Sequence, residues 1–199
     1  MKILAISDTP SKALWDYCTK ERLAGIDLIL SCGDLPKKYL EYLTNFTAAP
    51  ILYVHGNHDG SYRQEEPGGC IRYNKDPEAY QYTEREMRRR VRKLWFKAHR
   101  AGGIDLLLTH SPASGINDGF DKAHKGFVCF NDLLEEYRPK WFVHGHIHLN
   151  YDAKLPRVCS HGPTTIINAT ERYEFEIPDP DPAARRKFFW KNPAFPTEN

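Results

Sequence analysis

Ile51-Leu52-Tyr53-Val54-His55-Gly56-Asn57-His58-Asp59 is the stretch that decides the fold, because a strand-like apolar run passes directly into polar groups. An amide oxygen, an imidazole and a carboxylate side by side can ligate a metal, transfer a proton and orient a neighbour. The same three residues are also compatible with an ordinary polar turn, since Asn and Asp accept tight backbone geometry. Four other apolar runs of the chain end in the same way, and this repetition favours a functional site.

The pattern extends in both directions from this stretch. Strand-like runs at 2–7, 26–32, 104–109 and 140–143 end at Asp8, at Asp34, at His110, and at His146 with His148. Helical periodicity separates the runs, at 11–23, 37–46, 84–100 and 127–137. Strands that alternate with helices predict βαβ units and a parallel sheet. Since ligands bind at the carboxyl ends of parallel strands, we expect the five strand ends to meet at one site.

The alternation stops after the fifth strand. Residues 164–168 and 172–177 are predicted to form two short antiparallel strands. Residues 178–199 are rich in proline, and we expect an extended tail packed by its apolar cluster Phe188-Phe189-Trp190, with a partner-docking peptide as the alternative. No repeat or linker divides the rest, so residues 1–177 are predicted to form one domain.

Composition limits the cellular locations and the classes of binding partner that we expect. The chain has 199 residues, five cysteines without a Cys-x-x-Cys pair, and a formal net charge of +2. A nearly neutral protein has no overall electrostatic reason to bind nucleic acid or an anionic membrane, so neither is expected as a partner. The widely spaced cysteines indicate reduced, structural thiols, and the apolar N-terminal segment is too short for a signal sequence or a membrane span. A cytoplasmic location is therefore predicted.

One basic run needs separate consideration. Arg88-Arg89-Arg90-Val91-Arg92-Lys93 lies in the predicted helix 84–100 and is compatible with nucleic-acid docking. Glu84 and Glu86 lie three or four residues ahead of arginines in this run, and such pairs are typical of a solvated helix face. We therefore expect a solvated face, and a nuclease is only a third functional possibility.

The groups at the strand ends are carboxylates, a carboxamide and imidazoles, which suit divalent ions such as Mn, Fe, Zn, Ni or Co. Because no thiolate is among them, a structural zinc site is not expected. The candidate ligands are Asp8, Asp34, Asn57, His110, His146 and His148. Six ligands exceed the needs of one tetrahedral ion and favour two ions, which at a separation of roughly 3.5 to 4 Å can clamp a phosphoryl oxygen and acidify a bridging water. The pattern predicts hydrolysis of a phosphate ester, with His58 protonating the leaving oxygen.

The ordered motifs resemble those of the calcineurin-like metallophosphoesterase superfamily over residues 2 to about 177. They are Asp8, Gly33-Asp34, Gly56-Asn57-His58-Asp59, Thr109-His110 and Gly145-His146-Ile147-His148. The resemblance implies a calcineurin-like α/β fold, in which two mixed β-sheets pack as a sandwich flanked by helices.

The resemblance also implies roles for single residues. Asp34 would bridge two ions, and Asp8 and His148 would belong to the first ion. His58 would be the catalytic histidine. The remaining ligands of the second ion would be Asn57, His110 and His146.

Two positions depart from the family pattern. The first family motif is usually Asp-x-His, whereas this chain has Asp8-Thr9-Pro10. Because proline has no ligating side chain, the first ion would bind weakly, take an extra water, or be absent. Between residues 59 and 84 relatives often carry a further strand pair. The loop composition of this segment, with one strand-like fragment at 70–73, predicts a smaller sheet and a more open cleft.

The other polar residues have structural alternatives. His124, in the polar loop 115–126, is a candidate substrate contact, with a loop-stapling hydrogen bond as the alternative. His144 is expected to face the core, with contact to metal or substrate as the other possibility. Asp59 is expected to orient a ligand rather than to bind metal. Three further histidines are expected to be structural: His55, His99 and His161.

These features predict a dinuclear, or mononuclear, metallophosphoesterase that attacks phosphorus in line with a metal-bound hydroxide. The expected substrate is a small phosphate ester, and a shallow site slightly favours a phosphodiester over a monoester. The alternative, which Pro10 supports, is a non-catalytic scaffold or binding protein that keeps the fold with an incomplete first metal site.

Overall fold

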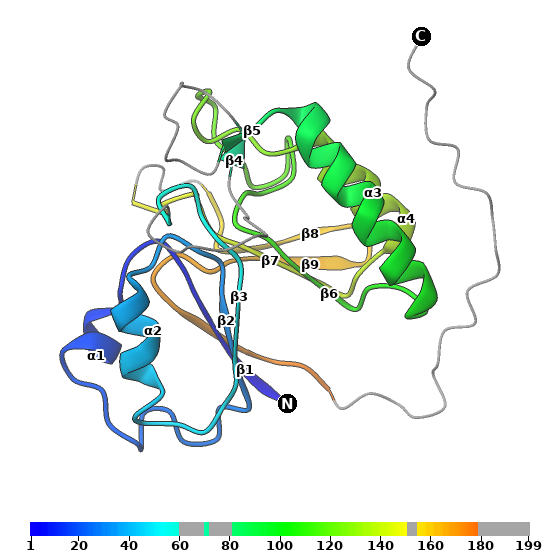
Figure 1. Ribbon diagram of the computed structural model, residues 1–199. Coiled ribbons are helices and arrows are strands. Elements are labelled where there is room, and N and C mark those ends of the chain that lie inside the picture. The colour runs from blue at the N-terminus through cyan, green and yellow to red at the C-terminus, as the bar shows by residue number, and fades with distance from the viewer. Residues whose placement is uncertain (60–69, 72–80, 151–154, 179–199) are drawn as a thin grey trace, which may run out of the picture.

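The computed structural model describes residues 1–59, 70–71, 81–150 and 155–178. Figure 1 shows two sheets that pack together, with helices on their outer sides. The strand orders are β10-β1-β2-β3 and β6-β7-β9-β8, and each sheet contains both parallel and antiparallel neighbours. The predicted α/β sandwich of two mixed sheets flanked by helices is therefore confirmed.

The first sheet has three parallel strands, and its fourth strand is antiparallel to β1: β1 (Lys2–Ile6), β2 (Leu28–Ser31), β3 (Ile51–Tyr53) and β10 (Tyr173–Glu176). Both faces of β1 are apolar because each face packs against a different core. Leu4 and Ile6 contact the cluster under the helices, whereas Ile3 and Ala5 belong to the cluster between the two sheets. Burial on both faces explains why this strand is a continuous apolar run rather than an alternating one.

The second sheet has three parallel strands and one antiparallel edge strand: β6 (Leu106–Leu108), β7 (Trp141–His144), β9 (Thr164–Asn168) and β8 (Val158–His161). Val143 and Ile167 from this sheet join the cluster between the sheets. This central cluster fixes the two sheets relative to each other.

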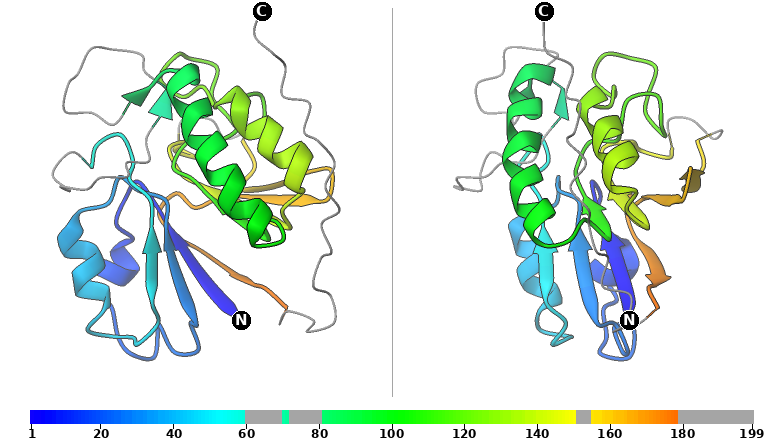
Figure 2. Two further views of the ribbon diagram at one scale, coloured as in Figure 1. Left: turned by 45° about the vertical axis from the view of Figure 1, so that its right-hand side comes forward. Right: turned by 90° about the vertical axis from the view of Figure 1, so that its right-hand side faces the viewer.

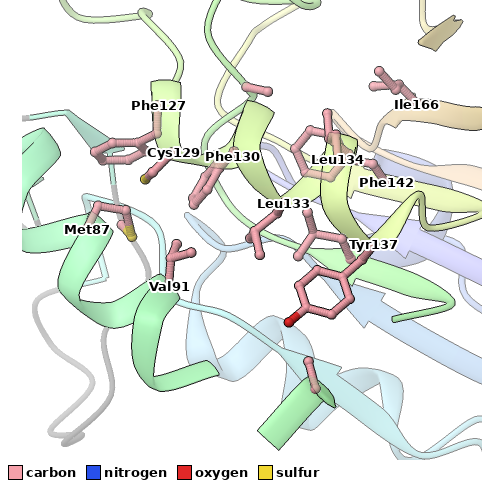
Figure 3. Close-up of a cluster of buried hydrophobic side chains, with 13 residues drawn as sticks. Met87, Val91, Phe127, Cys129, Phe130, Leu133, Leu134, Tyr137, Phe142 and Ile166 are labelled. Carbon is pink, nitrogen blue, oxygen red and sulfur yellow. The ribbon is translucent and has the colours of Figure 1, made fainter. Parts of the chain in front are cut away.

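Helices cover the outer faces of both sheets, as Figure 2 shows from two further sides. The first sheet packs against α1 (Lys12–Trp15) and α2 (Lys37–Leu43), and the second packs against α3 (Glu84–Arg100) and α4 (Val128–Tyr137). In Figure 3, Met87 and Val91 from α3 lie beside Phe127 and Cys129 at the start of α4. Among the described residues, no helix is both long and apolar enough to cross a membrane.

The prediction that residues 164–168 and 172–177 pair with each other is wrong. β9 pairs with β7 and β8 in one sheet, whereas β10 pairs with β1 in the other. The chain crosses between the sheets at Glu171, which has a left-handed φ of +65° and donates its backbone N–H to the carbonyl of Ser7. The crossing places apolar side chains of both strands in the cluster between the sheets.

Two further expectations need correction. The helix predicted over 11–23 is helical only over Lys12–Trp15, because Thr19 accepts hydrogen bonds from Arg22 through its hydroxyl and its carbonyl and forms a local turn. The segment after residue 59 does contain a strand pair, since β4 (Cys70–Ile71) runs parallel to β5 (Gln81–Tyr82). Strand β8 was not anticipated, because its sequence is short and partly polar.

Some expectations fall outside the described residues. They are the loop composition assigned to 60–69 and 72–80 and the extended tail with its cluster Phe188-Phe189-Trp190. These remain predictions from the sequence.

Candidate metal centre

Three of the predicted ligands have an unusual backbone conformation. Asp8, Asp34 and His146 have positive φ angles of +64°, +56° and +68°, in the left-handed region that non-glycine residues rarely adopt. Each lies just beyond the carboxyl end of a strand, at β1, β2 and β7 respectively. Strained backbone of this kind concentrates at functional sites, where the surrounding structure holds it in place.

Glycines allow the strand ends to approach closely. A Cβ atom at Gly33 would lie 2.2 Å from the backbone nitrogen of Gly56, and one at Gly56 would lie 2.0 Å from Oδ1 of Asp34. At Gly145 a Cβ would lie 1.9 Å from Oγ of Ser7. Only a hydrogen atom fits at these three positions, which gives a physical reason for the glycines of the motifs.

Three of the predicted ligands converge around the ring of a fourth, His110. Its Nε2 atom lies 3.0 Å from Oδ1 of Asn57, 3.1 Å from Nδ1 of His146 and 3.4 Å from Oδ2 of Asp34. Asn57, His110 and His146 are buried, and Asp34 is half-buried. Asp34, His110 and His146 form a group whose ligand atoms all lie within 4.8 Å of one another.

One ring nitrogen of His110 and one of His146 face each other, and the other nitrogen of each ring is held by a backbone carbonyl. Nδ1 of His110 donates to the carbonyl of Cys32 at 2.7 Å, and Nε2 of His146 donates to the carbonyl of Ala123 at 2.7 Å. Burial and the neighbouring His110 lower the pKa of His146 well below its ordinary value, so this imidazole is neutral. The two facing nitrogens, together with the oxygens of Asn57 and Asp34, form a donor set that fits a divalent ion of borderline hardness.

A network of backbone donors orients Asp34. Its Oδ1 atom accepts the backbone N–H of His58 at 2.7 Å, which leaves Oδ2 turned toward His110. Asp59 is buried, and its Oδ2 atom accepts the backbone N–H groups of Asp34 at 2.9 Å and Gly56 at 2.7 Å. Burial raises the pKa of Asp59, while these two donors oppose the shift. Asp59 thus holds the strand end that carries Asp34.

The two remaining candidate ligands lie at the edge of this group. Asp8 accepts the backbone N–H of His146 at 2.9 Å and 3.1 Å, one distance for each carboxylate oxygen. Burial raises the pKa of Asp8, whereas the charges of His110 and His148 lower it, so His148 lies within electrostatic range of Asp8. Within the described part of the chain, neither belongs to the three-residue metal group.

The hydroxyl of Thr170 is a neighbour of Asp8 that sequence reasoning missed. It lies 3.2 Å from Oδ2 of Asp8 and 2.8 Å from the carbonyl of Ile147. The strand crossing that brings Thr170 here has no local sequence signal. The carbonyls of Cys32 and Ala123 were also missed, because the identity of a residue does not reveal a backbone acceptor.

A loop packs over the metal group. The Ala123 carbonyl that holds His146 belongs to this loop, and the ring of His124 lies 5.3 Å from the ring of His146. Asp121 staples the loop, since its Oδ2 atom accepts from Nδ1 of His124 at 2.8 Å and its Oδ1 atom accepts two backbone N–H groups. The stapling hydrogen bond is present, and it places His124 beside a candidate ligand.

The remaining predicted histidines are not part of the metal group. His58 is exposed to solvent next to the buried Asn57. His144 is fully buried against Phe142, with ring centroids 5.4 Å apart, so it faces the core as expected. The three histidines expected to be structural each contact a neighbouring side chain: His55 with Tyr53, His99 with Trp95, and His161 with Glu135.

Comparison with known proteins identifies the family. Residues 1–171 match the calcineurin-like phosphoesterase superfamily domain. The chain belongs to this superfamily. The family predicted from the motifs is therefore confirmed, and the membership implies divalent metal ions, which the group around His110 is able to ligate.

Individual relatives match over smaller shares. The chain is similar to metallophosphoesterase domain-containing protein 1 of Homo sapiens and of Mus musculus, with 34% identity over 71 residues. The match covers 34% of this chain and only 20% of the length of these relatives. Vacuolar protein sorting 29 of Cryptosporidium parvum aligns with 18% identity and a TM-score of 0.42, covering 84% of this chain and 72% of that one.

Proposed function

We propose that this phosphoesterase-family protein is a metal-dependent hydrolase of phosphate esters. The observation that carries the proposal is the pair of facing ring nitrogens, Nε2 of His110 and Nδ1 of His146, 3.1 Å apart, with Asn57 and Asp34 beside them. Divalent ions bound there would supply positive charge that activates water and stabilises the phosphoryl oxygens. The reaction would be an in-line displacement of the leaving oxygen at phosphorus.

The ligands would differ in how tightly they hold ions. Asp34, His110 and His146, together with the Asn57 amide oxygen, would hold one ion tightly. Asp8 and His148 would hold a second ion more weakly, with Asp34 shared between the two. The backbone contact of Asp8 with His146 and the lack of a ligand at position 10 support this difference. Manganese is the first ion to test among Mn, Fe, Zn, Ni and Co.

His58 and His124 would act on the substrate itself. His58 is exposed beside the metal group, and its backbone N–H is anchored on Asp34 at 2.7 Å, which supports a role as proton donor to the leaving oxygen. His124 would contact the phosphoryl group from the loop that Asp121 staples. We infer a small phosphate ester as substrate, a phosphodiester before a monoester, and a cytoplasmic location. All five cysteines are free thiols, which supports the location.

Hydrolysis by protein that is stripped of metal and then reloaded with a chosen ion tests the proposal. The protein would be treated with chelator, desalted and reloaded with each divalent ion, and bis(4-nitrophenyl) phosphate would be compared with 4-nitrophenyl phosphate. We expect hydrolysis that depends on Mn and is abolished in His110→Ala. His161→Ala, which removes a histidine that pairs with Glu135, is the matched control and should keep full activity.

Absence of hydrolysis with every ion would overturn the enzyme proposal. It would favour the alternative of a binding protein with an incomplete first site, which Pro10 supports. In that case the protein would still bind one ion tightly in a calorimetric titration.

A further inference from the structure

A stripe of exposed cations runs along the outer face of α3. Its positions recur at four, seven, eight, twelve and fifteen residues from the first, which places them on one side of a helix. The six members are Arg85, Arg89, Arg92, Lys93, Lys97 and Arg100, all of them exposed. Over these sixteen positions the helix rises about 22 Å. The opposite side of α3 carries the buried residues Met87, Val91 and Ala98.

The two glutamates of α3 lie in its first turn and have defined contacts. Glu84 accepts the backbone N–H groups of Val128 and Cys129 at 3.0 and 2.7 Å and contacts Arg88, so it is turned toward α4. Glu86 closes the capping box with Thr83 through hydrogen bonds of 2.7 and 2.9 Å. The expected pair of Glu84 with Arg88 is present at 3.4 Å, and the six cations of the stripe are exposed.

The arginines outside the stripe also have defined contacts. Arg88 binds Asp132 of α4 at 2.6 Å. Arg90 lies over the ring of Tyr82, with its Cζ atom 5.1 Å from the ring centroid. Arg88 and Arg90 are thus directed at neighbouring elements and are only partly exposed, whereas the stripe residues are exposed.

An exposed aromatic ring lies within the stripe. Phe96 is 61% exposed, and it follows Arg85, Arg89 and Arg92 at helical spacing on the same face. The guanidinium carbon of Arg100 lies 6.0 Å from its ring centroid. An exposed phenyl ring among cations matches a ligand that combines phosphates with flat bases.

We propose that this face of α3 binds single-stranded nucleic acid. The cations would contact successive backbone phosphates, and Phe96 would stack on an unpaired base. An anionic membrane is the less favourable partner, because insertion needs a broad apolar face, and the exposed large apolar side chains of α3 are limited to Leu94 and Phe96. A duplex would satisfy the cations but would offer no unstacked base to Phe96.

The position of α3 agrees with a role beside the metal centre. In Figures 1 and 2 the first turn of α3 lies toward the same end of the molecule as the carboxyl ends of β1, β2 and β3. The inference goes beyond the proposed hydrolysis and does not depend on it.

Binding without catalysis is the direct test. Anisotropy of a fluorescent 20-residue oligodeoxythymidine would be followed in EDTA at several salt concentrations, so that neither metal nor hydrolysis contributes. The variant R89Q/K93Q/K97Q removes three cations of the stripe. The matched control K12Q/K20Q/K38Q removes three exposed lysines in and around α1 and α2. Thermal unfolding by circular dichroism would verify that both triple variants are folded.

The expected results separate charge from stacking. The stripe variant should bind at least tenfold more weakly at about 0.1 M salt, and its slope of log K against log salt should fall by about 2, which is 0.7 for each of three lost contacts. Phe96→Ala should lose about fivefold or more in affinity with an unchanged slope. The control variant should lose much less affinity than the stripe variant.

Three outcomes would overturn the inference. They are equal losses in the stripe and control variants, tighter binding to a duplex of the same length, and binding to phosphatidylglycerol vesicles in preference to the oligonucleotide. Each is independent of whether the metal-loaded protein hydrolyses a phosphate ester. Failure of this inference is therefore distinguishable from failure of the proposed function.

Discussion

Asp59→Ala tests whether the strand end that carries Asp34 is held as the geometry implies. The substitution leaves the backbone N–H groups of Asp34 and Gly56, now bound at 2.9 and 2.7 Å, without their acceptor. An unsatisfied buried donor costs about 1–3 kcal/mol, so two would cost about 2–6 kcal/mol. Removal of a buried carboxylate, whose pKa burial raises, offsets part of this. We expect a net loss of about 2–3 kcal/mol in the free energy of unfolding.

The same substitution should weaken metal binding through Asp34. Loss of a group that orients a metal ligand typically costs about 10- to 100-fold in affinity. Asp59→Asn keeps an oxygen that can accept from both donors, so it should remain within about 1 kcal/mol of the wild type in stability. Urea unfolding of the metal-free proteins and calorimetric titration with Mn would measure the two effects. An alanine variant with wild-type stability and wild-type Mn affinity would refute the assigned role of Asp59.

Three further perturbations follow from the site. Pro10→His should raise the Mn content after desalting from one ion per chain to two, whereas Pro10→Ala should not; two tightly held ions in the wild type would contradict the weak first site. Gly56→Ala introduces a Cβ 2.0 Å from Oδ1 of Asp34. It should lower the affinity for Mn, measured by calorimetry, by about 10- to 100-fold. The control Gly162→Ala, whose Cβ meets nothing within 4 Å, should keep the wild-type affinity for Mn. Burial lowers the pKa of His144 from 6.5 to about 4. As the pH falls, His144 therefore takes up a proton in the unfolded chain before it does so in the folded protein. Its contribution to the free energy of unfolding is fully present above about pH 6.5 and should decline by about 3 kcal/mol toward pH 4. Urea unfolding at pH 7 and pH 5 would measure this decline, which should be smaller in His144→Asn. The same decline in the variant and the wild type would show that His144 is not its source.

The strands that carry the site could be predicted because each is an apolar run with a polar end. Burial on both faces makes β1 and β2 continuous in the sequence, so their ends at Asp8 and Asp34 are visible without any structure. Pairing was harder to predict. The partner of β10 is β1, at the other end of the chain, and the left-handed turn at Glu171 that sends it there depends on a backbone contact with Ser7.

The candidate ligands could be picked out from the sequence, but the backbone groups that hold them could not. His110 and His146 are recognisable as imidazoles at strand ends, yet the carbonyls of Cys32 and Ala123 decide which nitrogen of each ring is available. The contact of Asp8 with a backbone group could not be predicted for the same reason. Its two oxygens meet the backbone N–H of His146, a contact that depends on how the two sheets are placed.

The candidate metal centre belongs to neither sheet alone. Asp34 and Asn57 come from the first sheet, whereas His110 and His146 come from the second, and the Nδ1 contact of His110 with the Cys32 carbonyl joins the two. The separation of the ligands is therefore set by the apolar cluster between the sheets rather than by the motifs themselves. Close packing of that cluster holds the candidate ligands at separations near 3 Å, because a packed core resists small displacements. The glycines then act locally, by removing the side chains that would keep the two sets of strand ends apart.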